Sequence, residues 1–181
     1  MGRNRGWHVK IGKALRERCR PIELLVLDVD GVLTDGGIIV DDEGVETKVF
    51  FVRDGLAIKY WQRAGKKVAV VSARRSKATE RRTAELGIEY VRQGTLDKLA
   101  AVDEILGAER LERRQACFVG DDVVDLAAMR AVGLGVAVAD AAADVGPAAT
   151  YVTQARGGRG AVREVVELVL RAQGRWQALL E

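Results

Sequence analysis

The chain has few of the residues that mark disulfide-rich, zinc-binding or disordered proteins. Its 181 residues include two Cys, two Pro and one His. Two cysteines without a spacing motif form neither a disulfide framework nor a zinc site, and they are typical of a reducing compartment, so we expect a cytoplasmic protein. The single histidine, His8, stands in the N-terminal leader. A Ser-His-Asp or Cys-His catalytic arrangement is therefore not expected.

Long apolar runs are also missing from the chain. The longest, such as residues 24–27 and 68–71, have the length of a strand, whereas a membrane-spanning helix needs about twenty apolar residues. Aromatic residues make up only 5% of the chain, while 48% of it is hydrophobic and 30% is charged. This composition predicts one globular domain with a mostly aliphatic core and no membrane partner.

Positive charge is concentrated at the N-terminus. Residues 1–20 carry a net charge of +6, and the other residues carry −3. The leader has no apolar segment of the kind that a signal peptide needs. A nucleic-acid-binding arm is an alternative, but the domain behind it has no stacking aromatics in basic surroundings, so we expect no nucleic-acid partner. We predict a basic leader with a helix (1–20), one domain (21–174) and a C-terminal tail (175–181).

Apolar runs alternate with amphipathic stretches along the chain, which predicts an α/β fold with a doubly wound, mostly parallel sheet. An alternating pair, residues 37–40 and 47–52, flanks a turn-rich segment and predicts a β-hairpin inserted after the first strand. The remaining predicted strands cover residues 23–27, 67–71, 88–92, 116–119, 135–138 and 151–152. The predicted helices cover residues 13–20, 54–64, 76–86, 97–106, 122–132 and 161–172.

Reactive groups in a doubly wound sheet lie outside the carboxyl ends of the strands. Most of the residues directly after the apolar runs are acids, accompanied by one serine and by one lysine that opens a helix. In chain order they are Asp28, Asp30, Ser72, Lys98, Asp121, Asp122 and Asp125.

Crowded carboxylates raise one another's pKa unless a cation offsets their charge. Oxygen ligands suit a hard ion such as Mg²⁺, which also accepts water and phosphate oxygens. The pattern therefore predicts phosphoryl transfer. Asp28 would be the nucleophile that forms an aspartyl-phosphate, and Asp30 would protonate the leaving oxygen and then activate water. Mg²⁺ would lie between Asp28, Asp121 and the phosphate.

Ser72 and Lys98 would hold the phosphate oxygens, and Asp125, one helical turn from Asp121, would orient Lys98 or a metal-bound water. A lone Asp-x-Asp is more typical of a turn or a helix cap. Four such elements in this order, each at a strand end, are specific to the catalytic interpretation.

These motifs resemble those of a known family. Asp28-Val-Asp-Gly-Val-Leu-Thr-Asp35, Ser72, Lys98 and Gly120-Asp-Asp-x-x-Asp125 are similar to the four motifs of the haloacid dehalogenase superfamily of phosphatases. Phe51-Val-Arg-Asp-Gly55 and Gly157-Gly-Arg-Gly160 further resemble the 3-deoxy-D-manno-octulosonate (Kdo) 8-phosphate phosphatases of that superfamily. The resemblance runs from about Arg16 to Gly174.

The resemblance implies a Mg²⁺ site made by Asp28, the backbone carbonyl of Asp30, and Asp121, with Asp122 and Asp125 in supporting positions. It also implies an enzyme without a large cap domain, since no gap between the motifs can hold one. Members of this group form homotetramers in which the hairpins build a central barrel and neighbouring subunits cover the active site.

The resemblance further suggests which arginines contact the anionic sugar-acid phosphate. We assign this role to Arg53, Arg74, Arg159 and Arg163. The chain departs from the usual pattern at Ala73, where relatives have glycine. Serine at position 72 keeps the hydroxyl that contacts phosphate. Alanine at position 73 restricts the φ and ψ angles available to the loop, compared with glycine.

Three alternatives differ in substrate or in function. An N-acylneuraminate or deaminoneuraminate 9-phosphate phosphatase would use the same chemistry, but its relatives can carry an acid where Arg159 stands. A signalling receiver domain uses similar residues in a different strand order. A catalytically silent tetramerisation module would have lost the nucleophile, whereas Asp28 and Asp30 are both present.

Overall fold

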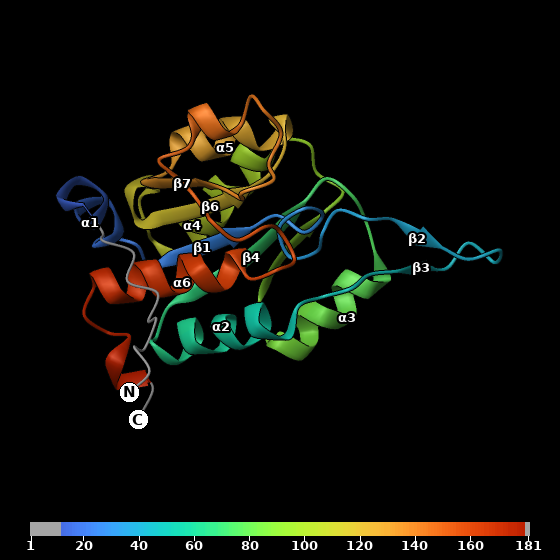
Figure 1. The fold of residues 1–181 in the computed structure, drawn as a ribbon, viewed down its shortest axis with the longest axis horizontal. Coiled ribbons are helices and arrows are strands. Elements are labelled where there is room, and N and C mark those ends of the chain that lie inside the picture. Colours follow the sequence, from blue (N-terminus) through green and yellow to red (C-terminus); the bar gives the residue numbers. More distant parts are fainter. Residues whose placement is uncertain (1–11, 180–181) are drawn as a thin grey trace, which may run out of the picture.

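The computed structural model describes residues 12–179. Its centre is a six-stranded parallel sheet with the strand order β5-β4-β1-β6-β7-β8 (Figure 1). The strands are β1 (Leu24–Leu27), β4 (Lys67–Ser72), β5 (Tyr90–Gln93), β6 (Ala116–Gly120), β7 (Leu134–Ala137) and β8 (Tyr151–Val152). This arrangement confirms the predicted parallel α/β sheet and places β1 next to β4 and β6.

Helices cover both faces of the sheet. The group α1, α2 and α6 packs on one face and the group α4 and α5 on the other, while α3 lies beside α2 (Figure 1). The helices are α1 (Lys13–Cys19), α2 (Val52–Arg63), α3 (Lys77–Leu86), α4 (Lys98–Glu109), α5 (Leu126–Ala131) and α6 (Ala161–Ala172). Short 3₁₀ turns are η1 (Arg113–Gln115), η2 (Val123–Asp125), η3 (Gly146–Ala148) and η4 (Gln177–Leu179).

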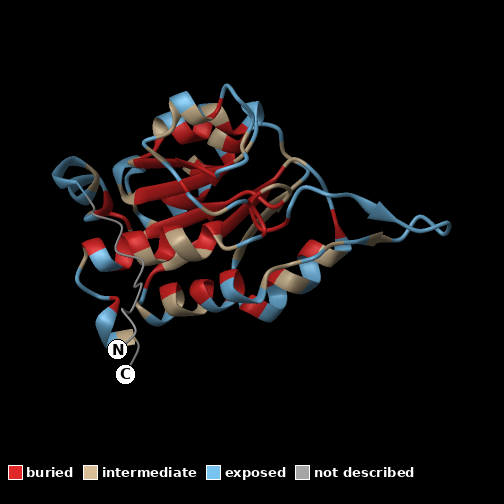
Figure 2. Cartoon of the chain, in the orientation of Figure 1, coloured by how far each residue is buried: buried red, intermediate tan, exposed pale blue. Residues whose placement is uncertain are grey.

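The central strands are buried on both faces, which is why they are continuous apolar runs in the sequence. Leu25 and Leu27 of β1 belong to the core beneath α2 and α6. Leu24 and Val26 alternate with them and belong to the core beneath α4 and α5. The strands appear as the buried centre of the molecule in Figure 2.

The helix α2 begins at Val52, two residues before the predicted start at Asp54. The prediction treated Asp54 as the residue that opens this helix. In the structure its carboxylate instead accepts hydrogen bonds from the backbone N–H groups of Gly160 (3.1 Å) and Arg163 (2.8 Å) at the start of α6. Asp54 thus caps a different helix, which sequence-local reasoning does not reveal.

The helix predicted over residues 122–132 is divided into η2 and the short helix α5. The carboxylate of Asp125 accepts hydrogen bonds from the backbone N–H groups of Asp121 (2.9 Å) and Asp122 (3.2 Å). The backbone N–H of Asp125 donates to the carbonyl of Asp122 at 2.9 Å, an i to i+3 bond that makes this a 3₁₀ turn, and the α-helix starts at Leu126.

The predicted hairpin is present, with shorter strands than expected. The strands β2 (Ile39–Val40) and β3 (Glu46–Thr47) pair antiparallel and project from the body of the molecule (Figure 1). Strand pairing ends at Thr47, and the side chain of the next residue, Lys48, is only 1% exposed. The outer part of the hairpin is exposed (Figure 2).

The ends of the described chain pack on the core. Cys19 in α1 is fully buried, and Trp176, in the predicted C-terminal tail, is 3% exposed and packs edge-on against Tyr60 at 5.6 Å. The first part of the predicted leader, residues 1–11, lies outside the described residues. Within residues 12–179, no helix combines the length and the apolar character that crossing a bilayer requires.

Candidate active site

The predicted reactive residues gather at one edge of the sheet. Asp28 follows β1, Ser72 ends β4 and Asp121 follows β6. Because these three strands are parallel neighbours, their carboxyl ends meet at the same edge. Lys98 reaches this edge from the first turn of α4, and its side chain is almost fully buried.

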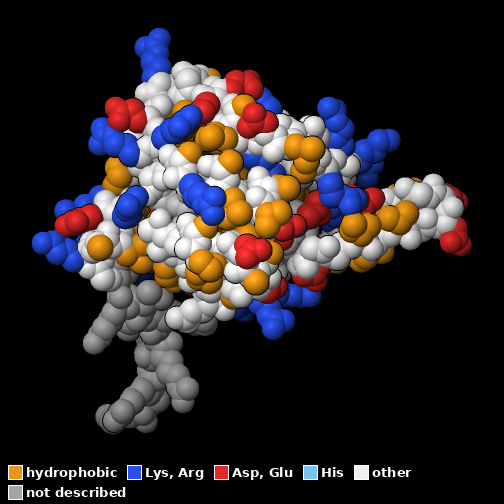
Figure 3. All heavy atoms as spheres, turned by 90° about the horizontal axis from the view of Figure 1, so that it is seen from above, with side chains coloured by type: hydrophobic (Ala, Val, Ile, Leu, Met, Phe, Trp, Pro, Cys, Tyr) orange, Lys and Arg blue, Asp and Glu red, His pale blue; other side chains and the backbone are white. Residues whose placement is uncertain are grey.

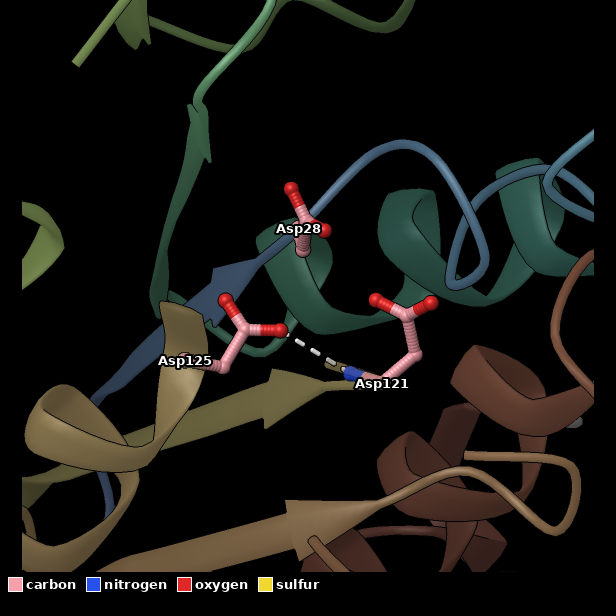
Figure 4. A group of neighbouring side chains, drawn as sticks. All are labelled: Asp28, Asp121 and Asp125. Atoms are coloured by element: carbon pink, nitrogen blue, oxygen red, sulfur yellow. Dashed lines mark hydrogen bonds between the residues drawn. The ribbon is translucent and has the colours of Figure 1, made fainter. Parts of the chain in front are cut away.

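Three carboxylates meet at this edge (Figure 4). Asp28, Asp121 and Asp125 each offer an oxygen within 4.8 Å of the others. The ammonium of Lys98 lies 2.9 Å from Oδ1 of Asp28 and 2.6 Å from Oδ1 of Asp125. Lys98 thus pairs with two of the three acids, and the cluster keeps an excess of negative charge.

The oxygens of the cluster differ in how far they are already paired. Asp125 uses Oδ1 for Lys98 and Oδ2 for the backbone N–H groups of Asp121 and Asp122. In contrast, Oδ1 of Asp121 is buried and has no hydrogen-bond partner among the described residues. An unpaired buried carboxylate oxygen is costly unless a ligand completes it.

Burial and mutual repulsion shift the titration of these acids. Burial raises the pKa of Asp28 to about 6, against an opposing effect of Lys98. Burial, followed by the charges of Asp28 and Asp125, raises the pKa of Asp121 to about 8. Burial disfavours the charged form of Lys98, but the two aspartates beside it outweigh that effect and raise its pKa. Both aspartate shifts are those of carboxylates that lack a second cation.

The donor set fits Mg²⁺. Carboxylate oxygens are the ligands that this ion prefers, and the orphaned Oδ1 of Asp121 is buried beside the carboxylate of Asp28. Asp125 is already occupied by Lys98 and two amides, so it suits a supporting position. The pairing of the oxygens therefore favours Asp28 and Asp121 as ligands.

Glycines allow two loops to approach the cluster. Gly31 has φ of +87°, and a Cβ there would lie 2.0 Å from Oδ2 of Asp121. A Cβ on Gly157 would lie 1.7 Å from the carbonyl oxygen of Gly31. Any side chain at either position would push the loop after β1 away from Asp121 or from the loop before α6.

Asp30 lies apart from the three clustered carboxylates and is held by cations. Lys48 donates a hydrogen bond to its Oδ1, and Nε of Arg74 lies 3.7 Å from its Oδ2. Arg74 follows Ser72, whose Oγ accepts a hydrogen bond from the backbone N–H of Arg74 at 3.2 Å. Arg74 therefore contacts Asp30 through its side chain and Ser72 through its backbone.

The other predicted arginines are spread over the surface. Arg159 pairs with Asp35 at 3.3 Å, which places it beside the loop after β1. Arg53 is exposed and lies over the ring of Phe51. Arg163 pairs with Glu167 and stacks on Trp176 at 4.7 Å, in contacts that belong to the packing of α6.

Asp122, predicted to support the metal ligands, is exposed and caps η2 by accepting a hydrogen bond from the N–H of Val123 at 2.7 Å. Sequence reasoning also missed three residues that shape this region: Glu46 and Lys48, which contact Arg74 and Asp30, and Asp54. The alternation of the hairpin strand places positions 46 and 48 on one face, a signal that could have been used.

Comparison with known proteins identifies the family. A haloacid dehalogenase-like hydrolase model matches residues 91–165. The 3-deoxy-D-manno-octulosonate 8-phosphate phosphatase of Yersinia pestis is 46% identical over 157 residues, which cover 87% of this chain and 84% of the relative. The enzyme of the same name from Escherichia coli K12 is 47% identical over 154 residues, which cover 85% of this chain and 82% of the relative. The chain belongs to this phosphatase family.

Solved structures of the family share the fold. The Yersinia pestis enzyme superposes with a TM-score of 0.90 at 44% identity, covering 91% of this chain and 89% of that one. The Moraxella catarrhalis enzyme, determined with magnesium, phosphate and Kdo, superposes with a TM-score of 0.89 at 39% identity, covering 91% of this chain and 95% of that one. This agreement confirms the predicted capless α/β architecture.

Proposed function

We propose that this protein is a Mg²⁺-dependent phosphatase that hydrolyses Kdo 8-phosphate to Kdo and phosphate in the cytoplasm. The observation that carries the proposal is the edge cluster, in which Asp28 and Asp121 face each other beside the buried Lys98. The identity to Kdo 8-phosphate phosphatases over most of the chain supports the substrate. The free buried cysteines, Cys19 and Cys117, support a reducing compartment.

In the first step, a carboxylate oxygen of Asp28 attacks the phosphorus and the bond from phosphorus to the sugar oxygen breaks. Asp30 donates a proton to that leaving oxygen, so the oxygen departs as a hydroxyl group of the sugar acid. Lys98, 2.9 Å from Asp28, orients the nucleophile and offsets charge on the phosphoryl group. Mg²⁺, when bound by Asp28, Asp121 and the carbonyl of Asp30, lowers the repulsion between the nucleophile and the phosphate.

In the second step, water attacks the phosphorus of the aspartyl-phosphate while Asp30 accepts its proton. The bond from phosphorus to Asp28 breaks, which releases phosphate and restores the carboxylate. The hydroxyl of Ser72 and the guanidinium of Arg74 hold phosphate and substrate oxygens. Asp125 keeps Lys98 in place through its 2.6 Å contact.

The proposal is tested by phosphate release from Kdo 8-phosphate, N-acetylneuraminate 9-phosphate and simple sugar phosphates, with Mg²⁺ and with EDTA. We expect fast release from Kdo 8-phosphate alone, abolished by EDTA. Fast phosphate release from the neuraminate ester instead would show that this ester is the substrate, while the proposed phosphatase mechanism would stand. No release from any ester by the folded protein would favour the catalytically silent module and overturn the enzymatic function.

We also propose that the chain assembles as a homotetramer through its hairpins. An isolated two-stranded hairpin is marginally stable in water, and this one carries apolar side chains on the part nearest the body of the molecule (Figure 3). These side chains are each 53% to 57% exposed in the single chain: Ile38, Ile39, Val40, Val45 and Val49. Contact with the hairpins of other copies would bury this surface. In such an assembly, Arg159, whose side chain is 59% exposed, would reach the sugar-acid carboxylate bound by a neighbouring subunit, whereas Arg163 stays engaged with Glu167 and Trp176.

A further inference from the structure

Two carboxylates and two cationic side chains form a closed ring of ion pairs where the hairpin meets the active site. Lys48 contacts Oδ1 of Asp30 and lies 3.3 Å from Oε1 of Glu46. Arg74 contacts Oε2 of Glu46, and its Nε lies 3.7 Å from Oδ2 of Asp30. Each carboxylate thus meets both cations, one through each of its oxygens.

The ring joins segments with different roles. Asp30 and Arg74 belong to the loops after β1 and β4, at the edge that carries Asp28. Glu46 lies in β3 and Lys48 follows that strand directly. The returning arm of the hairpin therefore supplies one acid and one base to the active-site edge.

Lys48 is buried to an unusual degree for a lysine, with a side chain that is 1% exposed. Burying an ammonium is costly unless its charge is paired. Here the carboxylates of Asp30 and Glu46 are both within reach, and they are themselves only 21% and 18% exposed. Without Lys48, Asp30 would keep only the more distant contact with Arg74, whose side chain is 44% exposed.

We propose that Lys48 is a positioning residue that holds the carboxylate of Asp30 in its reactive orientation, with Glu46 as the second anchor of its ammonium. This inference rests on the proposed function, in which Asp30 moves the proton of both steps. Because proton transfer requires a defined geometry, a carboxylate that loses this contact transfers the proton less efficiently even when substrate binds normally.

A double-mutant cycle tests this role. The turnover of Kdo 8-phosphate with Mg²⁺ is measured for the wild type, Lys48→Met, Asp30→Asn and the double variant, with single-turnover phosphate release for the slow forms. We expect Lys48→Met to lower kcat roughly 10- to 100-fold with KM changed less than about threefold. In the Asp30→Asn background the same change should lower kcat less than about threefold, because the residue through which Lys48 acts is absent.

Three further variants serve as controls for the proposed role of Lys48. Lys48→Arg keeps a cation at the position and should recover much of the lost kcat. Lys13→Met removes the same charge from the exposed end of α1 and should leave both constants unchanged. Glu46→Gln weakens the second anchor and should give a smaller loss of kcat, again only when Asp30 is present, so the idea stays testable if Lys48→Met does not fold.

Equal losses of kcat in the two backgrounds would assign Lys48 a purely structural role and overturn the inference, as would an unchanged kcat in Lys48→Met. Either result with an active wild type leaves the proposed function intact. A folded wild type that releases no phosphate would instead overturn the proposed function and this inference together.

Discussion

The carboxyl edge of the sheet and the β2–β3 hairpin meet at Asp30 and Lys48. They differ in how many of their side chains find contacts within the same chain. At the edge, buried strands position charged groups whose partners are mostly within the same chain, such as Lys98 with Asp28 and Asp125. Along the hairpin, apolar side chains such as Ile39 are left exposed. The edge holds three carboxylates against the single cation of Lys98, whereas the hairpin leaves apolar side chains exposed.

The difference lies in what stabilises each region. Phe118 and its neighbours in the central strands are fully buried between two layers of helices. The hairpin has only the short pairing of Ile39–Val40 with Glu46–Thr47. The sheet can therefore position reactive groups within a single chain, and the hairpin gains most from other copies.

The largest expected effect comes from removing the nucleophile at the edge. Asp28→Asn should lower kcat by at least about 10⁴-fold, because the amide cannot form the aspartyl-phosphate. Circular dichroism and the melting temperature should remain close to those of the wild type, since the amide has nearly the volume of the acid. Residual turnover within tenfold of the wild type would show that another group attacks the phosphorus.

The second effect concerns the packing that supports the edge. Phe118→Ala should lower the free energy of unfolding by about 3–5 kcal/mol, because the side chain is fully buried in β6 and its loss leaves a cavity. Urea denaturation measures this change. Phe118→Leu retains most of the apolar volume and should lose less. A loss below about 1 kcal/mol for alanine would contradict close packing at this strand.

The third effect is a change in stability with pH that comes from Asp54, a buried acid outside the metal-binding cluster. Burial raises the pKa of Asp54 to about 6, so the folded state holds its proton more tightly than the unfolded state does. Its contribution therefore lowers the free energy of unfolding as pH rises between about 4 and 6, by about 2 kcal/mol between pH 4 and pH 7.

Denaturation at the two pH values should reveal this as a difference between the wild type and Asp54→Asn, which cannot titrate. Asp28 and Asp121 are present in both proteins, so their titration cancels in the difference between the two. The asparagine keeps an oxygen that can accept from the N–H groups at the start of α6. An identical pH dependence in the two proteins would contradict the shift.

The smallest change in the stability of one chain is expected for the hairpin. Ile39→Lys places a charge on the proposed contact surface and should convert the tetramer to smaller species, measured by sedimentation velocity. Since Ile39 packs little within its own chain, the melting temperature of the dissociated protein should fall by only a few degrees. Val152→Lys, on the exposed edge strand β8, is the matched control. An unchanged assembly in Ile39→Lys would argue against hairpin contacts.

Much of the fold followed from local pattern. The helix α6 was predicted with the bounds it has, Ala161–Ala172, because an apolar stripe follows a glycine-rich turn. The strand β5 was predicted two residues early, since Ile88 still belongs to the end of α3, where its N–H donates to the carbonyl of Thr83 at 2.9 Å. A helix end of this type hides the start of the following strand.

The sequence by itself determined the order of the strands along the chain and the residue types at their carboxyl ends, since burial on two faces demands continuous apolar runs and Asp28, Ser72 and Asp121 follow them. It could not determine which side chains would meet across the fold. Whether Asp54 caps its own helix or α6, and whether Lys48 faces solvent or Asp30, depended on contacts between segments 18 to 109 residues apart. Only the tertiary structure decided these pairings, because a charged side chain is buried where distant partners offset the loss of its water.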